Sequence, residues 1–161
     1  MRGEVNELRD FLKEQYAAEL GAFRAALNTV PEKSFALSGT GHSPAWHALH
    51  IAEWLRLAVL NDRSPSYAHL GWEDQAWTRE LGGTPARGES AGKDAVLAYL
   101  DDISGQVLTF LQGMSEADIR GTSFSPSAPN GERPRLQGLG LHLRHIAYHR
   151  GQVRLGMKEQ A

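Results

Sequence analysis

The chain has 161 residues, which is enough for one domain with a sizeable core and too few for two comfortable ones. Hydrophobic residues make up 41% and charged residues 22%, as in a globular protein, and a net charge of −2 leaves no basic excess to bind a nucleic-acid backbone. The absence of cysteine excludes disulfides, thiolate metal sites and a cysteine nucleophile. Any metal site must therefore use imidazole and carboxylate ligands, and the chain has seven histidines.

Two segments in the first half of the chain have the periodicity of helices. The first is predicted over about residues 4–29, where apolar residues recur three or four apart and form one stripe. The second is predicted over about residues 43–61. Ser43 is its expected N-cap, and Pro44 takes the first helical position, where a missing N–H costs nothing.

Two further helices are predicted in the second half. The third spans about residues 90–113 and has the most regular apolar face of the chain. The fourth spans about residues 134–156 and contains Gly138, Gly140 and Gly151, each of which weakens a helix by about 1 kcal/mol relative to alanine. A helix that tolerates such glycines usually packs closely against a neighbour or is held by another interaction.

The two long connections decide the expected topology. Residues 62–89 are long enough to run back along a helix of about 18 residues, so the second and third helices are predicted to be parallel and joined by a crossover. In residues 115–133, Ser115 and Asp118 predict the start of a short extra helix. No alternating run of β-branched residues predicts a strand. We therefore expect an all-α fold, a four-helix bundle with a long crossover between helices two and three, formed by residues 1–161 as a single domain.

Neither a membrane span nor an export signal is predicted. No stretch approaches the roughly 20 consecutive apolar residues of a membrane span. The first ten residues are rich in charge and lack the apolar core of a signal peptide. The expected location is the cytoplasm.

The fourth predicted helix carries a histidine pair that suits metal binding. His145 and His149 are four residues apart, so both imidazoles project from one face, and two ring nitrogens can reach a single ion at about 2.0–2.1 Å. His142, three residues before His145, is the alternative ligand that could take the place of His145. Catalytic sites of the zinc type commonly use three protein ligands, so a third histidine from another helix would complete the site.

The second predicted helix offers this third ligand. His50 shares a face with Trp46 and Trp54 and is expected to point inward, whereas His47 is expected on a more exposed side. The three remaining candidates are interpreted as incidental: His42, His47 and His69. The alternative is that the inward histidines are core residues with separate hydrogen-bond partners, but three of them on two helices favour a metal site.

Two motifs resemble the DinB/YfiT-like metalloenzyme family. One is His50-Ile-Ala-Glu-Trp in the second helix, and the other is His145-Ile-Ala-Tyr-His149-Arg-Gly-Gln in the fourth. The resemblance covers nearly the whole chain and implies a four-helix bundle that carries a divalent metal, zinc or nickel, on His50, His145 and His149. It also implies a homodimer. Family members with an assigned activity include thiol S-transferases, a maleylpyruvate isomerase and hydrolase-like proteins.

The leading hypothesis is a metal-dependent enzyme of the thiol S-transferase or hydrolase-like type. Three neutral imidazoles would leave the ion its full charge, which lowers the pKa of a bound water or thiol. Since the chain has no cysteine, a thiol nucleophile would come from a low-molecular-weight cosubstrate. Glu53, one turn from His50, is the candidate catalytic residue, either orienting an imidazole or moving a proton. Its alternative role is an ion pair with Arg56 or another arginine. Tyr148 and Gln152 are weaker candidates beside the metal.

Three other functions are weighed against this one. The first is a non-enzymatic metal-binding or small-ligand-binding protein of a stress response. The second is a structural helical dimer whose histidines are satisfied in the core. The third is DNA binding through a local basic cluster on and before the fourth helix. We interpret this cluster as a solvated face or an anion-attracting rim, because the chain is acidic overall. The expected partner is a small-molecule substrate, not a nucleic acid or a membrane.

Overall fold

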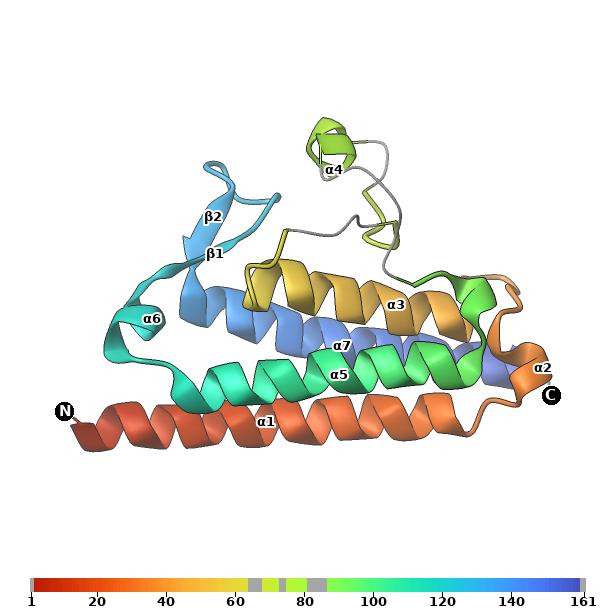
Figure 1. Cartoon of the computed structure of the whole chain (residues 1–161), viewed down its shortest axis with the longest axis horizontal. Coiled ribbons are helices and arrows are strands. Elements are labelled where there is room, and N and C mark those ends of the chain that lie inside the picture. The colour runs from red at the N-terminus through yellow and green to blue at the C-terminus, as the bar shows by residue number, and fades with distance from the viewer. Residues whose placement is uncertain (1, 64–67, 73–74, 81–86, 160–161) are drawn as a thin grey trace.

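The computed structural model describes residues 2–63, 68–72, 75–80 and 87–159 (Figure 1). The predicted all-α fold is confirmed: most of the described chain is helical, with one small two-stranded sheet. The four long helices are α1 (Arg2–Asn28), α3 (Pro44–Trp54), α5 (Lys93–Gly113) and α7 (Arg135–Glu159). A π-helix, η1 (Leu55–Val59), continues α3. The shorter elements are α2 (Glu32–Phe35), α4 (Ala76–Glu80), the 3₁₀-helix η2 (Glu89–Ala91), α6 (Glu116–Arg120), β1 (Thr122–Phe124) and β2 (Glu132–Pro134).

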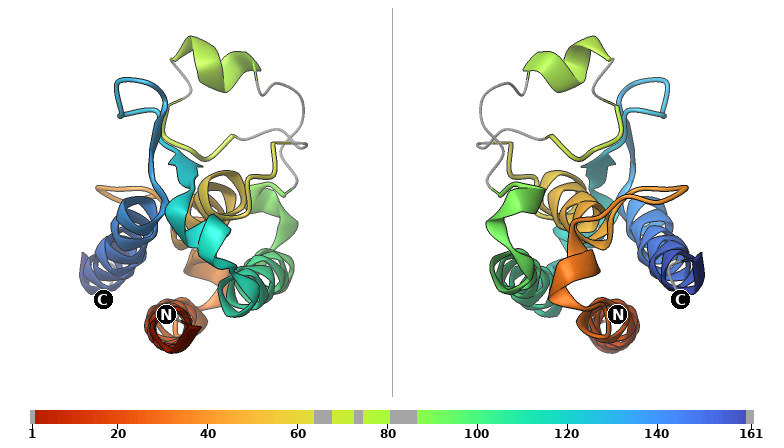
Figure 2. Two further views of the ribbon diagram at one scale, coloured as in Figure 1. Left: turned by 90° about the vertical axis from the view of Figure 1, so that its left-hand side faces the viewer. Right: turned by 90° about the vertical axis from the view of Figure 1, so that its right-hand side faces the viewer.

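The four long helices form a bundle in which each packs against two neighbours. Helices α1 and α3 both contact α5 and α7, so the order around the bundle is α1, α5, α3, α7 (Figure 2). Helices α3 and α5 both run from the α2 end toward the α6 end, so they are parallel, as the crossover prediction requires (Figure 1). The crossover lies on the outer side of α3, and its residues 64–67, 73–74 and 81–86 lie outside the described part (Figure 2).

Helix ends and core faces follow the local sequence. The Ser43 side chain accepts a hydrogen bond from the Trp46 N–H at 3.0 Å, which confirms the predicted cap of α3. Ser115 and Asp118 form a reciprocal capping box at the start of α6, also as predicted. The stripes of α1 and α5 supply a large part of the bundle core, with these residues buried: Leu12, Tyr16, Leu20, Phe23, Leu27, Val96, Leu100, Ile103 and Val107. None of the described helices combines the length and apolar character that crossing a membrane requires.

The absence of strands was predicted wrongly for the segment before α7. Strands β1 and β2 pair antiparallel with Ser123 opposite Arg133. Three residues in each strand are too few to show an alternating pattern in the sequence. The hairpin packs on α7 at Gly138, where a Cβ atom would lie 3.1 Å from the Ser123 Cβ. This close approach explains one of the three glycines in the helix, whereas a Cβ at Gly140 or Gly151 would meet nothing within 4 Å.

Candidate metal centre

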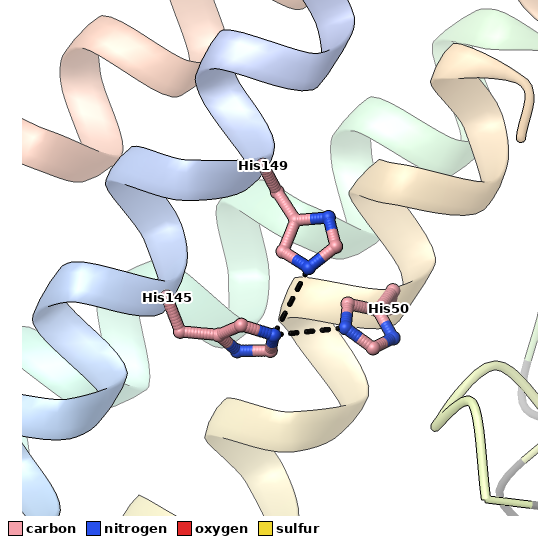
Figure 3. A group of neighbouring side chains, drawn as sticks. All are labelled: His50, His145 and His149. Atoms are coloured by element: carbon pink, nitrogen blue, oxygen red, sulfur yellow. Dashed lines mark hydrogen bonds between the residues drawn. The ribbon is translucent and has the colours of Figure 1, made fainter. Parts of the chain in front are cut away.

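Three histidines from α3 and α7 converge on one point between these helices (Figure 3). His145 and His149 lie one turn apart on the side of α7 that faces α3, and His50 projects from α3 toward them. The His145 Nε2 atom lies 2.9 Å from the His50 Nε2 and 3.0 Å from the His149 Nε2. All three ligand atoms lie within 4.8 Å of one another, and this is the one such group among the described residues. The structure thus brings together the three residues proposed from the sequence.

The donor set fits a cation better than it fits hydrogen bonding alone. An ion at about 2.0–2.1 Å from each imidazole needs ligand nitrogens about 3–3.5 Å apart, close to the two distances found here. If His50 and His149 each carry their proton on Nδ1, both of their Nε2 lone pairs face the Nε2 atom of His145. In its neutral form, His145 has at most one proton on that atom. One proton cannot serve both contacts well, whereas a cation among the rings satisfies all three lone pairs. The three buried or half-buried histidines can therefore hold a metal ion.

The ring of His50 is fixed by a buried chain of hydrogen bonds that reaches into the crossover. Its Nδ1–H donates to the backbone carbonyl of His69 at 2.5 Å, which directs the Nε2 lone pair at the metal centre. The backbone N–H of His69 donates to the Glu53 carboxylate at 2.8 Å, and the His69 Nδ1 lies 3.2 Å from its other oxygen. Glu53 is fully buried, so its carboxylate orients His50 through His69. The orienting role expected of Glu53 thus acts through His69, which the sequence did not single out. His69 gives no signal in the sequence because it lies in an irregular segment without periodicity.

His149 is held in a similar way by His47. The two Nδ1 atoms lie 2.8 Å apart, so one ring donates to the other, and donation by His149 leaves its Nε2 lone pair toward the centre. The prediction that His47 is exposed and incidental was wrong, since the residue is 6% exposed. Nine of the eleven residues of α3 are buried, because α5, α7 and the crossover cover the helix on several sides. Apolar periodicity cannot identify an exposed side on a helix that is covered almost all round.

Replacing His47 tests this positioning role. We expect His47→Ala to lower the metal affinity by about 10–100-fold, the usual effect of losing a group that orients a ligand. His47→Asn can still offer an amide oxygen as acceptor and should recover part of that affinity. Competition with a chromophoric chelator measures both values. Equal affinities of His47→Ala and the unchanged protein would contradict the role.

Burial keeps the histidines of this region neutral. Loss of hydration is the largest cause and lowers the pKa of His50 to about 2, of His149 to about 3 and of His145 to about 4. For His50 and His149, neighbouring histidines lower the pKa further. The pKa values of His47 and His142 are lowered by burial to about 4 and about 3. Neutral imidazoles are the form that binds a metal ion.

These shifts predict that acid destabilises the metal-free protein. Unfolded histidines titrate near pH 6.5, so between about pH 6.5 and pH 4 the unfolded chain binds more protons than the native protein. The free energy of unfolding should therefore fall as the pH drops through this range, by up to about 1.4 kcal/mol per pH unit for each buried histidine. Urea unfolding with EDTA between pH 7 and pH 5 measures the slope. In His142→Phe the slope should be smaller by the contribution of one histidine. A free energy of unfolding that does not change with pH in either protein would refute the prediction.

The other candidates lie around the centre without joining it. His142 is buried and belongs to the wall of a cavity beside His50 and His145, so it is outside the converging group. Tyr148 is 62% exposed and meets the His149 ring edge-on, whereas Gln152 lines a separate hollow that also includes His47.

Two tryptophans of α3, Trp46 and Trp54, lie beside the metal centre. Trp46 stacks on His50 with ring centroids 4.4 Å apart. Trp54 is buried, donates from Nε1 to the Leu70 carbonyl at 2.9 Å and lines the cavity beside His50. Trp54 is thus both a buried residue and part of the cavity wall.

Comparison with known proteins agrees with this arrangement of helices and histidines. The model of the DinB superfamily matches residues 12–153, a range that includes α3, most of α7 and all three converging histidines. No curated protein and no solved structure matches the chain significantly. The match covers most of the 161 residues. The chain therefore belongs to the DinB superfamily.

Proposed function

We propose that this protein binds one divalent metal ion, zinc or nickel, at His50, His145 and His149 and uses it as a metal-dependent enzyme on a small molecule. The observation that carries the proposal is the convergence of three Nε2 atoms within 4.8 Å. For His50 and His149, the other ring nitrogen is already engaged by His69 and His47. An ion held by neutral imidazoles keeps its charge and acts as a Lewis acid on a coordinated group.

The residues around the site support a thiol S-transferase or a hydrolase-like activity. A cavity of about 170 Å³ is lined by His50 and His145, so a substrate there lies next to the metal ligands. The chain supplies no thiol of its own, and an S-transferase reaction would take its sulfur from a low-molecular-weight cosubstrate. His50, His145 and His149 hold the metal in this proposal, while Glu53, acting through His69, orients His50 and His47 orients His149.

One observation favours a second candidate, a metal-binding or small-ligand-binding protein without catalysis. Glu53 was the acid or base proposed from the sequence, but its carboxylate is fully buried and accepts hydrogen bonds from His69. It therefore reaches the metal centre only through another residue. A stress-response binding protein needs the metal and the cavity but no positioned proton donor.

The experiment starts from protein purified without an affinity tag. Elemental analysis should find about one equivalent of a transition metal, and metal should raise the melting temperature because it binds the native state. Turnover of 1-chloro-2,4-dinitrobenzene with cysteine or glutathione tests transfer, and turnover of p-nitrophenyl acetate tests hydrolysis. Activity that is lost on chelation and restored by metal supports an enzyme. Stoichiometric metal with no turnover favours the second candidate, and failure to take up any metal overturns both.

We also propose a homodimer. Several large apolar side chains of the described chain are exposed: Phe11, Leu37, Leu136, Tyr148 and Leu155. Tyr148 and Leu155 lie seven residues apart on α7, about two turns, and so share one side of the helix. Light scattering of the purified protein gives the mass directly, and a monomer mass at about 50 µM would overturn the proposal.

A further inference from the structure

A cavity of about 170 Å³ opens beside the metal centre, between α3, the crossover, the β1 end and α7. Its apolar walls are Trp54, Leu70, Trp72, Phe124, Pro126 and Leu141. A cavity of about 150 Å³ with apolar walls is large enough to bind benzene. The cavity therefore suits an apolar group of the size of one aromatic ring.

Part of the cavity wall is polar and lies beside a positively charged side chain. Arg133 donates from Nε to the Ser125 Oγ at 2.7 Å and from Nη2 to the Ser127 Oγ at 3.0 Å, and both serines line the cavity. The two Oγ atoms are 3.4 Å apart, so at most one hydroxyl proton is used between them and the other can be donated to a ligand. Within the described chain, no carboxylate lies within 4.0 Å of the Arg133 guanidinium. The part of the cavity wall formed by these serines therefore favours a negatively charged oxygen of a ligand.

His142 adds an unpaired polar atom to the same cavity. The residue is 6% exposed, its ring is part of the cavity wall, and its buried Nδ1 has no hydrogen-bond partner among the described residues. Buried polar side-chain atoms in proteins are nearly always paired, so an unpaired one beside a cavity points to a missing partner. The ring is held against Trp54, with centroids 5.9 Å apart and planes 28° apart.

We propose that this cavity binds a small carboxylate whose apolar body, about one aromatic ring in size, lies against Trp54 and Trp72. Its carboxylate accepts from the Ser125 or Ser127 hydroxyl beside the Arg133 charge, and His142 offers a further hydrogen bond. Because His50 and His145 also line the cavity, the bound molecule lies next to the metal centre. The claim that this molecule is the substrate rests on the proposed function. Its binding in the cavity does not depend on that function.

Benzoate is the probe, and the full chain with EDTA is the protein, so that no metal can hold the carboxylate. Calorimetry should show saturable binding of benzoate. Benzyl alcohol keeps the ring without the charge, and acetate keeps the charge without the ring. Each should bind at least 10-fold more weakly than benzoate. Binding of benzyl alcohol as tight as benzoate would overturn the charge assignment, and equal binding of acetate would overturn the apolar site.

Two changes in the cavity wall and one control outside it test whether benzoate binds in this cavity. Leu141→Phe fills the cavity and should abolish benzoate binding, whereas Leu136→Phe, on the same helix at an exposed position outside the cavity, should leave it unchanged. The double variant Ser125→Ala/Ser127→Ala removes only the two hydroxyls and should weaken benzoate at least 3-fold, which keeps the test decisive if Leu141→Phe does not fold. Unchanged binding in Leu141→Phe or in the double serine variant would overturn the proposal. Metal content is measured separately in the same variants, so failure of the metal site and failure of the cavity give different results.

Discussion

Alanine at His50, His145 or His149 should each remove the bound metal from the purified protein. Each change deletes one of three converging nitrogen ligands, and the remaining two cannot hold the ion as tightly. We expect affinity to fall by more than the roughly 100-fold seen when only an orienting group is lost. Elemental analysis after dialysis should find about one equivalent in the unchanged protein and less than about a tenth in each variant.

His142→Ala is the matched control for this prediction. His142 lies on the same helix, three residues before His145, and is buried, but its ring is outside the converging group. This variant should keep its metal. Loss of metal from His142→Ala together with retention in His145→Ala would show that the ligand set is wrong. Circular dichroism of every variant separates loss of a ligand from loss of the fold.

Glu53→Ala should destabilise the protein by about 3 kcal/mol and also weaken metal binding. The change removes a fully buried carboxylate and leaves the backbone N–H of His69 without its acceptor. For a chain of this size, about 3 kcal/mol lowers the melting temperature by roughly 6–12 °C. Release of His69 also frees the carbonyl that orients His50, so metal affinity should fall by about 10–100-fold.

Glu53→Gln separates this anchoring role from catalysis by the carboxylate. The amide oxygen of glutamine can still accept from the His69 N–H, so stability and metal affinity should recover most of the loss. A catalytic base would behave differently, because Glu53→Gln would keep stability and metal while turnover fell. Thermal unfolding, metal affinity and turnover of the same variant therefore decide the role. A loss of turnover of more than about 100-fold at unchanged stability and metal content would contradict the anchoring role.

The sequence alone determined the helices and which histidines share a helix face. Apolar periodicity located the four long helices, and the serines at positions 43 and 115 marked two helix starts that the structure confirms. The spacing of His145 and His149 puts both rings on one side of α7, because four residues make about one helical turn. These features are local, so they can be deduced without knowing what the helix packs against.

The tertiary structure decided what surrounds each face. His47 contacts His149 because α7 packs beside α3, and His69 fixes His50 because the crossover folds back over α3. Ser125 lines the cavity and is bonded to Arg133 because a hairpin too short to show strand periodicity brings them there. The periodicity of one helix states which residues share a face but not which distant segment covers that face. The three converging histidines were therefore open to prediction, whereas the residues that orient them and the cavity beside them depend on how the chain packs.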